Sequence, residues 1–324
     1  MWPEEKYIEL PDLTMAYWEA GTPNPSRPSI ILCHGFPEIA YSWRYILPEI
    51  AAAGFHVIAP DQRGFGKTGR PHNDPQTADG VTLYDMPHLC GDMAHLLDAL
   101  GLEKAVFAGH DWGGIMMWQL PFYYPERIAG LIGVNTPFIP RLTLDPIDAF
   151  RAALGDDMYI VAFQKYGIAE AKLDADIARA LRCFYRTGAG PQTERPWSHF
   201  ELLNILDLDE ATWPGTPLLS AADFAVYEEA YTQSGFRGPI NWYRNFSRNW
   251  ELSASFEQKV SMPSLMISAE NDGFLPPSMA AGMGKYVDDL EKHIIPNCGH
   301  WTQNEKPAEL NALMIDWLTR RFVM

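Results

Sequence analysis

The chain has 324 residues, of which 47% are hydrophobic and 20% are charged, so it can bury a large core and lacks the composition of a disordered protein. Its formal net charge of −16 and its pI of about 4.9 disfavour binding to nucleic acid or to anionic membranes, because both repel a polyanion. No window approaches the length of a membrane-spanning segment, and the first residues do not form a signal peptide, so we expect a cytoplasmic protein.

The cysteines have no CxxC pair and no zinc spacing. We expect them to be reduced and mostly buried thiols. They are Cys33, Cys90, Cys183 and Cys298.

Strand and helix signals alternate along the first 137 residues. Short apolar or alternating runs predict strands, whereas apolar residues at three- and four-residue spacing predict helices. The expected strands lie at 14–21, 29–35, 56–64, 104–111 and 127–137, and the expected helices lie at 42–54, 83–101 and 113–125.

The pattern then changes over residues 138–255, where helical segments at 148–167 and 173–188 are followed by a Pro- and Trp-rich region at 190–200 and 211–217. Alternation returns with strands expected at 262–272 and 292–300 and helices at 278–287 and 306–322. We therefore expect an α/β protein with a mostly parallel, doubly wound sheet. Residues 1–137 and 256–324 would form a discontinuous core domain, and residues 138–255 an inserted helical cap, or lid.

Polar residues follow the expected strands at their carboxyl ends, where open parallel sheets bind ligands. They are His34, Asp61, Asp111, Asn135, Asp272 and His300.

The stretch GHDWGG at 109–114 lies between an expected strand and an expected helix. A glycine-framed turn of this kind normally presents a serine nucleophile, but the central residue here is Asp111. A carboxylate is ill suited to attacking an ester carbonyl, because the product is a high-energy anhydride. It is a competent nucleophile toward a saturated carbon that carries a leaving group, and it is ionised at neutral pH without a base. Helix capping would explain the aspartate but not its flanking glycines.

Six motifs together resemble the α/β-hydrolase superfamily, and within it the epoxide hydrolases. They are HGFPE (34–38), DQRGFGKT (61–68), GHDWGG (109–114), GFRGPINWYRN (235–245), AENDGFLPP (269–277) and CGHWTQNEKP (298–307). The resemblance covers nearly the whole chain and implies a protein similar to soluble epoxide hydrolase without an extra N-terminal domain. It implies the α/β-hydrolase fold, no cofactor and no metal.

The resemblance implies a catalytic triad of Asp111, Asp272 and His300. His300 would activate a water that attacks an ester formed on Asp111, and Asp272 would orient His300. His34 is the competing histidine, although the resemblance gives it a structural role. Glu270 is the alternative acid.

The backbone amides of Phe36 and Trp112 are the expected oxyanion hole, and the Phe36–Pro37 peptide bond is a candidate cis bond. Tyr243 and Tyr159 would donate hydrogen bonds to the epoxide oxygen, since a phenol keeps its proton at neutral pH. Tyr166 and Tyr185 lie close enough in sequence to compete with Tyr159. The expected substrate-binding residues are Phe36, Pro37, Trp112, Trp242 and Trp301.

The leading hypothesis is an enzyme that adds water to an apolar, mid-sized epoxide to give a vicinal diol, in a detoxification role. The alternative is a haloalkane or haloacid dehalogenase of the same fold. Haloalkane dehalogenases usually have Asn at the position of Phe36, and fluoroacetate dehalogenases generally have Arg at the position of Trp112. A catalytically silent binding protein would be expected to have an eroded triad. The sequence leaves a homodimer open.

Overall fold

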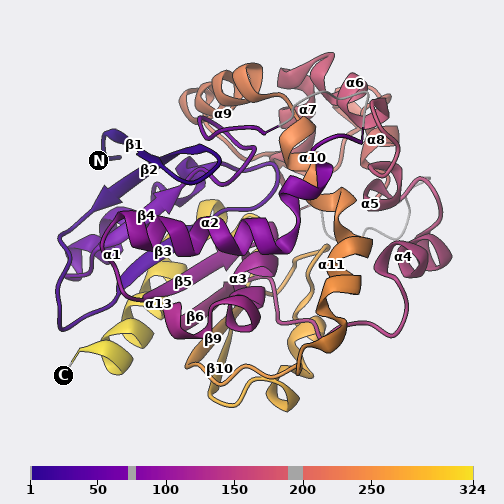
Figure 1. Cartoon of the computed structure of the whole chain (residues 1–324). Helices are drawn as coiled ribbons and strands as arrows, with labels where there is room; N and C mark the ends of the chain where they lie inside the picture. Colours follow the sequence, from indigo (N-terminus) through magenta and orange to yellow (C-terminus); the bar gives the residue numbers. More distant parts are fainter. Residues whose placement is uncertain (1, 72–77, 189–199, 324) are drawn as a thin grey trace.

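A computed structural model describes residues 2–71, 78–188 and 200–323. Within these residues the centre of the molecule is an eight-stranded sheet in the order β1-β2-β4-β3-β5-β6-β9-β10 (Figure 1). β1 pairs antiparallel with β2 and β2 with β4, and the remaining pairs are parallel. The strands are β1 (Glu5–Glu9), β2 (Thr14–Ala20), β3 (Ser29–Cys33), β4 (Val57–Pro60), β5 (Ala105–His110), β6 (Ile128–Val134), β9 (Ser264–Ala269) and β10 (Leu290–Ile295).

Helices cover both faces of this sheet, as expected for a doubly wound fold. α2 (Met86–Ala99) and α3 (Trp112–Tyr123) bury their apolar side chains in one core cluster. α1 (Leu47–Ala52) and α13 (Pro307–Phe322) bury theirs in a second cluster on the opposite face. β3 and β5 are completely buried, which explains why they read as continuous apolar runs rather than as alternating ones.

The segment between β6 and β9 is mainly helical and lies beside one end of the sheet (Figure 1). The division into a core of residues 1–137 and 256–324 and a cap of residues 138–255 stays a prediction, which this arrangement supports. The elements of the segment are α4 (Pro146–Leu154), α5 (Tyr159–Ala162), α6 (Ile168–Asp174), α7 (Ile177–Phe184), β7 (Arg186–Thr187), α8 (Leu202–Ile205), β8 (Thr216–Pro217), α9 (Ala221–Ser234), α10 (Arg237–Arg244) and α11 (Phe246–Leu252).

The α/β-hydrolase class expected from the sequence is confirmed, but local elements differ. β1 was not expected, because EKYIE is mostly exposed and gives a weak strand signal. The expected helix at 278–287 is wrong: two short 3-10 turns, Pro277–Ala280 and Met283–Lys285, replace it. Gly282 and Gly284 explain this difference, since glycine disfavours a continuous helix.

The expected helix at 42–54 is shorter than predicted, because α1 begins only at Leu47 with a proline in its first turn. Most of the Pro- and Trp-rich stretch at 190–200 lies outside the described residues. In the part of the chain that the structure describes, no helix has both the length and the apolar character needed to cross a membrane.

Candidate active site

The sharp turn between β5 and α3 presents Asp111 at the carboxyl end of the sheet. Asp111 has φ 50° and ψ −121°, a backbone conformation that L-residues rarely adopt. Glycine is needed in and beside this turn because its backbone packs closely against the backbone that follows β3. A Cβ on Gly113 would lie 2.2 Å from the carbonyl oxygen of Cys33, and one on Gly35 would lie 2.4 Å from the Cβ of Asp111. The glycines of GHDWGG and HGFPE therefore permit the close approach that exposes this carboxylate to the site.

Backbone amides hold the Asp111 carboxylate. The amide of Phe36 donates to Oδ1 at 2.8 Å, and the amide of Trp112 is near enough to favour the ionised carboxylate. Burial raises the pKa of Asp111 above its ordinary value, while the positive charge of His300 and the two amides act in the opposite direction. The Phe36–Pro37 peptide bond is cis, as the resemblance implied. The two amides expected to form an oxyanion hole thus face one carboxylate.

His300 and Asp272 form a hydrogen-bonded pair beyond the ends of β9 and β10. The ring Nδ1 of His300 lies 2.9 Å from Oδ2 of Asp272. Oδ1 of Asp272 accepts hydrogen bonds from the amides of Phe274 and Leu275 at 2.8 and 2.9 Å. Burial alone would raise the pKa of the Asp272 carboxyl, but His300 and these donors hold it well below its usual range. Burial alone would lower the pKa of His300, but the carboxylates of Asp272 and Asp111 raise it to about 9.

Asn135 fixes this pair from the end of β6. Its Nδ2 donates to Oδ2 of Asp272 at 2.7 Å and to the carbonyl of His300 at 3.0 Å. Its Oδ1 accepts from the hydroxyl of Thr302 at 2.7 Å, which leaves the amide nitrogen directed at the carboxylate. The sequence placed Asn135 only among the polar residues that follow the expected strands. The structure shows that it binds the acid.

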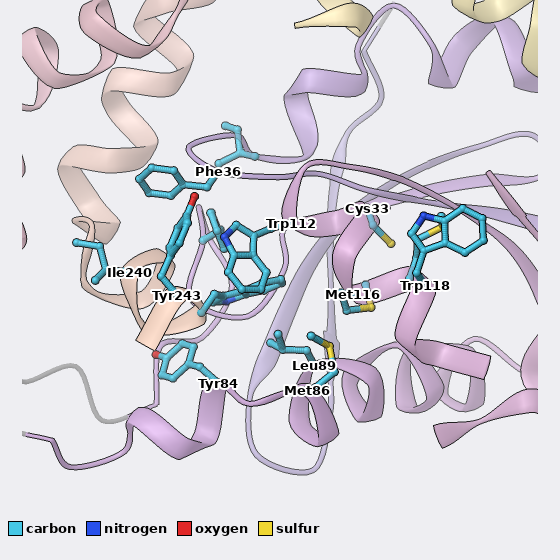
Figure 2. Packing of buried hydrophobic residues seen from close by; sticks show 14 of the residues in the cluster. Cys33, Phe36, Tyr84, Met86, Leu89, Trp112, Met116, Trp118, Ile240 and Tyr243 are labelled. Carbon is cyan, nitrogen blue, oxygen red and sulfur yellow. The ribbon is translucent and has the colours of Figure 1, made fainter. Parts of the chain in front are cut away.

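Tyr159 and Tyr243 come from the helical segment between β6 and β9 and line the same pocket as the carboxylate of Asp111. Tyr159 begins α5, Tyr243 lies in α10, and their ring centroids are 5.6 Å apart. Burial raises the pKa of both phenols well above the ordinary value, so both are hydrogen-bond donors at neutral pH. Figure 2 shows Tyr243 beside both Phe36 and Trp112, with ring centroids 5.2 and 5.0 Å from its own.

A single pocket brings these groups together. Its empty space, including the open mouth, is about 870 Å³. We call it the active-site pocket; its lining includes Asp111, His300, Tyr159 and Tyr243. Apolar side chains provide most of the remaining wall, among them Phe36, Phe184, Leu202, Ile205, Phe274 and Trp301. In the described part of the chain, no group of three or more His, Cys, Asp and Glu side chains is arranged to hold a metal ion.

The five expected substrate-binding residues divide into two groups. Phe36 and Trp301 line the active-site pocket, whereas Pro37, Trp112 and Trp242 do not. Trp242 is buried instead, and its Nε1 donates to the carbonyl of Arg63 at 3.0 Å. Neighbouring residues on a helix point about 100° apart, so a tyrosine that faces the pocket turns the preceding tryptophan away from it.

The competing residues lie elsewhere. His34 is buried and its Nε2 accepts a hydrogen bond from the amide of Gln62, and burial lowers the pKa of His34 to about 4. The carboxylate of Glu270 accepts a hydrogen bond from the amide of Asn297. Tyr166 is exposed and lies against arginine side chains, and the hydroxyl of Tyr185 donates to the carbonyl of Pro37. None of these four residues lines the active-site pocket.

The sequence reasoning missed a buried hydrogen-bonded pair, Glu38 and His110. The carboxylate of Glu38 accepts hydrogen bonds from Nδ1 of His110 at 2.7 Å, the amide of Gly35 at 2.9 Å and Nε2 of Gln303 at 2.8 Å. Burial alone would raise the pKa of Glu38, but His110 and the amide of Gly35 lower it. Nε2 of His110 faces the carbonyl of His300 at 2.8 Å.

Both ring nitrogens of His110 therefore lie within hydrogen-bond distance of an oxygen atom. The sequence signal that could have found this pair is a carboxylate in the motif HGFPE, Glu38, and a histidine in the motif GHDWGG, His110.

Fold and site together define a hydrolase of the α/β-hydrolase fold class. A family model described as "alpha/beta hydrolase fold" matches residues 28–307. Epoxide hydrolase A of Mycobacterium tuberculosis is 37% identical to the chain over 324 residues, with 98% of each protein covered. The chain belongs to the epoxide hydrolases of this family.

Two further comparisons agree. The crystal structure of epoxide hydrolase A from Mycobacterium thermoresistibile has a TM-score of 0.84, 36% sequence identity and 98% coverage of both chains. Bifunctional epoxide hydrolase 2 of Sus scrofa is 40% identical over 296 residues, which cover 90% of this chain and 52% of that protein. The chain thus spans about half the length of the bifunctional relatives that it matches.

Proposed function

We propose that the protein hydrolyses apolar epoxides to vicinal diols through a covalent ester on Asp111. The observation that carries the proposal is the placement of a carboxylate nucleophile, two protonated phenols and a His–Asp pair around one pocket. This set suits an epoxide, whose ring oxygen departs only when it is protonated or hydrogen-bonded as the C–O bond breaks.

In the first step the Asp111 carboxylate attacks one ring carbon from the side opposite the ring oxygen. The C–O bond of the ring breaks, and Tyr159 and Tyr243 hold the departing oxygen while one phenol gives it a proton. The products are an alkyl ester of Asp111, one hydroxyl group of the diol and a phenolate. No base is needed, because the carboxylate is ionised before the substrate arrives.

In the second step His300 takes a proton from water, and the resulting hydroxide attacks the carbonyl carbon of the ester. The amides of Phe36 and Trp112 stabilise the oxyanion. When the intermediate collapses, the second diol oxygen takes its proton from His300, and the carboxylic acid of Asp111 returns a proton to the phenolate. One oxygen of Asp111 has then come from water.

The proposed reaction transfers an oxygen atom from solvent water to Asp111, and isotope labelling can trace this atom. A single turnover of styrene oxide in H₂¹⁸O should label the peptide that contains Asp111, as measured by mass spectrometry after digestion. Diol formation with no label in that peptide would refute the ester. Asp111→Ala should abolish diol formation, and His300→Gln should accumulate an adduct whose mass equals that of the substrate.

The control is His293→Gln, because His293 does not line the active-site pocket and should be dispensable. Release of halide from a 1-haloalkane without diol formation from styrene oxide would favour the dehalogenase. A cytoplasmic location, a detoxification role and a homodimer stay predictions.

A further inference from the structure

The two tyrosines of the active-site pocket are carried by α5 and α10, which differ in how they are held. α10 is tied to the loop after β4, because Nε1 of Trp242 donates to the carbonyl of Arg63 at 3.0 Å. α5, which begins at Tyr159, has only four residues, and a helix of one turn is not stable by itself. The position of Tyr159 relative to Tyr243 therefore depends on contacts that hold α5 from outside.

The side-chain amide of Gln164 connects α5 to α10. Its Nε2 donates at 2.8 Å to the carbonyl of Ile160, which directly follows Tyr159, and at 3.1 Å to the carbonyl of Tyr243. An amide nitrogen carries two hydrogen atoms, so it can serve both acceptors at once. One side chain thus binds the backbone of one tyrosine and the backbone next to the other.

The guanidinium of Arg244, which directly follows Tyr243, binds the chain immediately after α5. Its Nε donates to the carbonyl of Phe163 at 2.9 Å, and its Nη2 donates to the carbonyl of Lys165 at 3.0 Å. Carbonyls at the carboxyl end of a helix have no partner within it, so the guanidinium supplies donors where α5 lacks them. The ring of Phe163 packs against both tyrosines, at centroid distances of 5.6 Å from Tyr159 and 5.2 Å from Tyr243.

Glu170, in α6, holds the guanidinium of Arg244 in this orientation. Oε1 of Glu170 accepts a hydrogen bond from Nη1 of Arg244, and Oε2 accepts one from Nη2 at 3.0 Å. Arg237 also donates to Oε1, at 3.1 Å. The side chains of Glu170 and Arg244 are each only 2% exposed, and a guanidinium bound at two points by a carboxylate has a fixed plane. The contact that holds α5 therefore comes from a buried ion pair.

We propose that Gln164 and Arg244 are positioning residues that set the spacing between the two tyrosine hydroxyls and so control the ring-opening step. The inference rests on the proposed function. In that step both phenols bind one oxygen atom, and a hydrogen bond weakens steeply when its geometry is distorted. A shift of α5 relative to α10 would weaken one of these bonds. Asp111 and His300 would stay in place, because they follow strands of the central sheet.

Gln164→Met tests this inference, because methionine has nearly the size of glutamine but no hydrogen-bond donor. In rapid-quench kinetics with styrene oxide, formation of the ester on Asp111 should slow at least about fivefold, while hydrolysis of the ester should change by less than about twofold. The matched control is Lys165→Met, because the side chain of Lys165 is exposed; both steps should keep their wild-type rates. Slowing of both steps by the same factor in Gln164→Met, or of neither, would overturn the inference.

A double-mutant cycle separates positioning from a general loss of structure. In the Tyr159→Phe background the hydroxyl that Gln164 positions is absent, so Gln164→Met should slow ester formation by less than about a further twofold. The same factor as in the wild-type background would overturn the inference.

Arg244→Lys keeps the charge opposite Glu170 but not the fork of donors, so it should repeat this pattern. If Arg244→Lys does not fold, the Gln164 variants decide alone. Failure of the wild-type protein to form diol from styrene oxide would instead overturn the proposed function.

Discussion

Replacement of Asp111 by Asn is expected to lower the pKa of His300. The neutral amide has nearly the shape of the carboxylate, and it resembles the proposed ester in having no charge. The pKa of His300 is raised to about 9 by the carboxylates of Asp272 and Asp111, with Asp272 the stronger influence. Loss of one negative neighbour makes the imidazolium easier to deprotonate, so the shift is downward.

The size of the shift follows from electrostatics. At an effective dielectric constant of about 20, two unit charges interact by roughly 4 kcal/mol at about 4 Å and by roughly half as much at twice that separation. The lower figure corresponds to about 1.5 pKa units, which is the decrease we expect. Formation of the ester would have the same effect as the substitution. It would bring the pKa of His300 closer to neutrality, so that a larger fraction of His300 releases its proton to solvent and can act as a base in the second step.

The assay is an NMR titration of ¹⁵N-histidine-labelled protein between pH 5 and 10, with His300→Gln used to assign the His300 signals. Intact mass confirms that the amide is retained. Asp272→Asn is the matched comparison and should lower the pKa of His300 further, because Asp272 is the stronger influence. An unchanged or increased pKa of His300 in the Asp111→Asn variant would refute the reasoning.

Three further substitutions test other parts of the site. Tyr243→Phe keeps the ring but removes a donor, so ester formation should slow at least about tenfold while ester hydrolysis changes less, as rapid-quench kinetics would show. Glu38→Gln replaces a carboxylate that accepts from His110, Gly35 and Gln303 with an amide, which has one acceptor oxygen, and should lower the free energy of unfolding in urea by about 1–3 kcal/mol; an unchanged midpoint would contradict a stabilising role for this network. Asn135→Ala removes a donor that lowers the pKa of Asp272. The stability that Asp272 contributes at neutral pH should therefore be smaller than in the wild type, and less of it should be lost as the pH falls below about 5, as thermal unfolding across this range would show.

The order and spacing of the motifs predicted that the reactive residues lie directly after strands. Asp111, Asp272 and His300 each follow a parallel strand, and such strands deliver their carboxyl ends to one edge of the sheet. The fold class and the grouping of these residues could therefore be read from the sequence. Tyr159 and Tyr243 were found only through the resemblance, because the helices between β6 and β9 give no spacing rule for residues far apart in the chain.

The direction of a side chain is harder to predict than its position. Trp242 lies next to a pocket-lining tyrosine and yet points into the core, and Trp112, which directly follows the nucleophile, does not line the active-site pocket. The partnership of Glu38 with His110 depends on two loops that meet only in the folded chain. A buried hydrogen bond between two loops produces no periodic pattern in the sequence, so it could not be predicted from the sequence.

The buried pair of Glu38 and His110 ties together parts of the chain that are remote in sequence. Its hydrogen bonds join residues 72 positions apart, and they extend to the carbonyl of His300 and to Gln303, which are 190 and 265 positions from their partners. The catalytic centre therefore forms only when the whole chain folds, because no single segment contains all of the hydrogen-bonded residues. On gradual warming, catalytic competence and tertiary order should disappear in one transition.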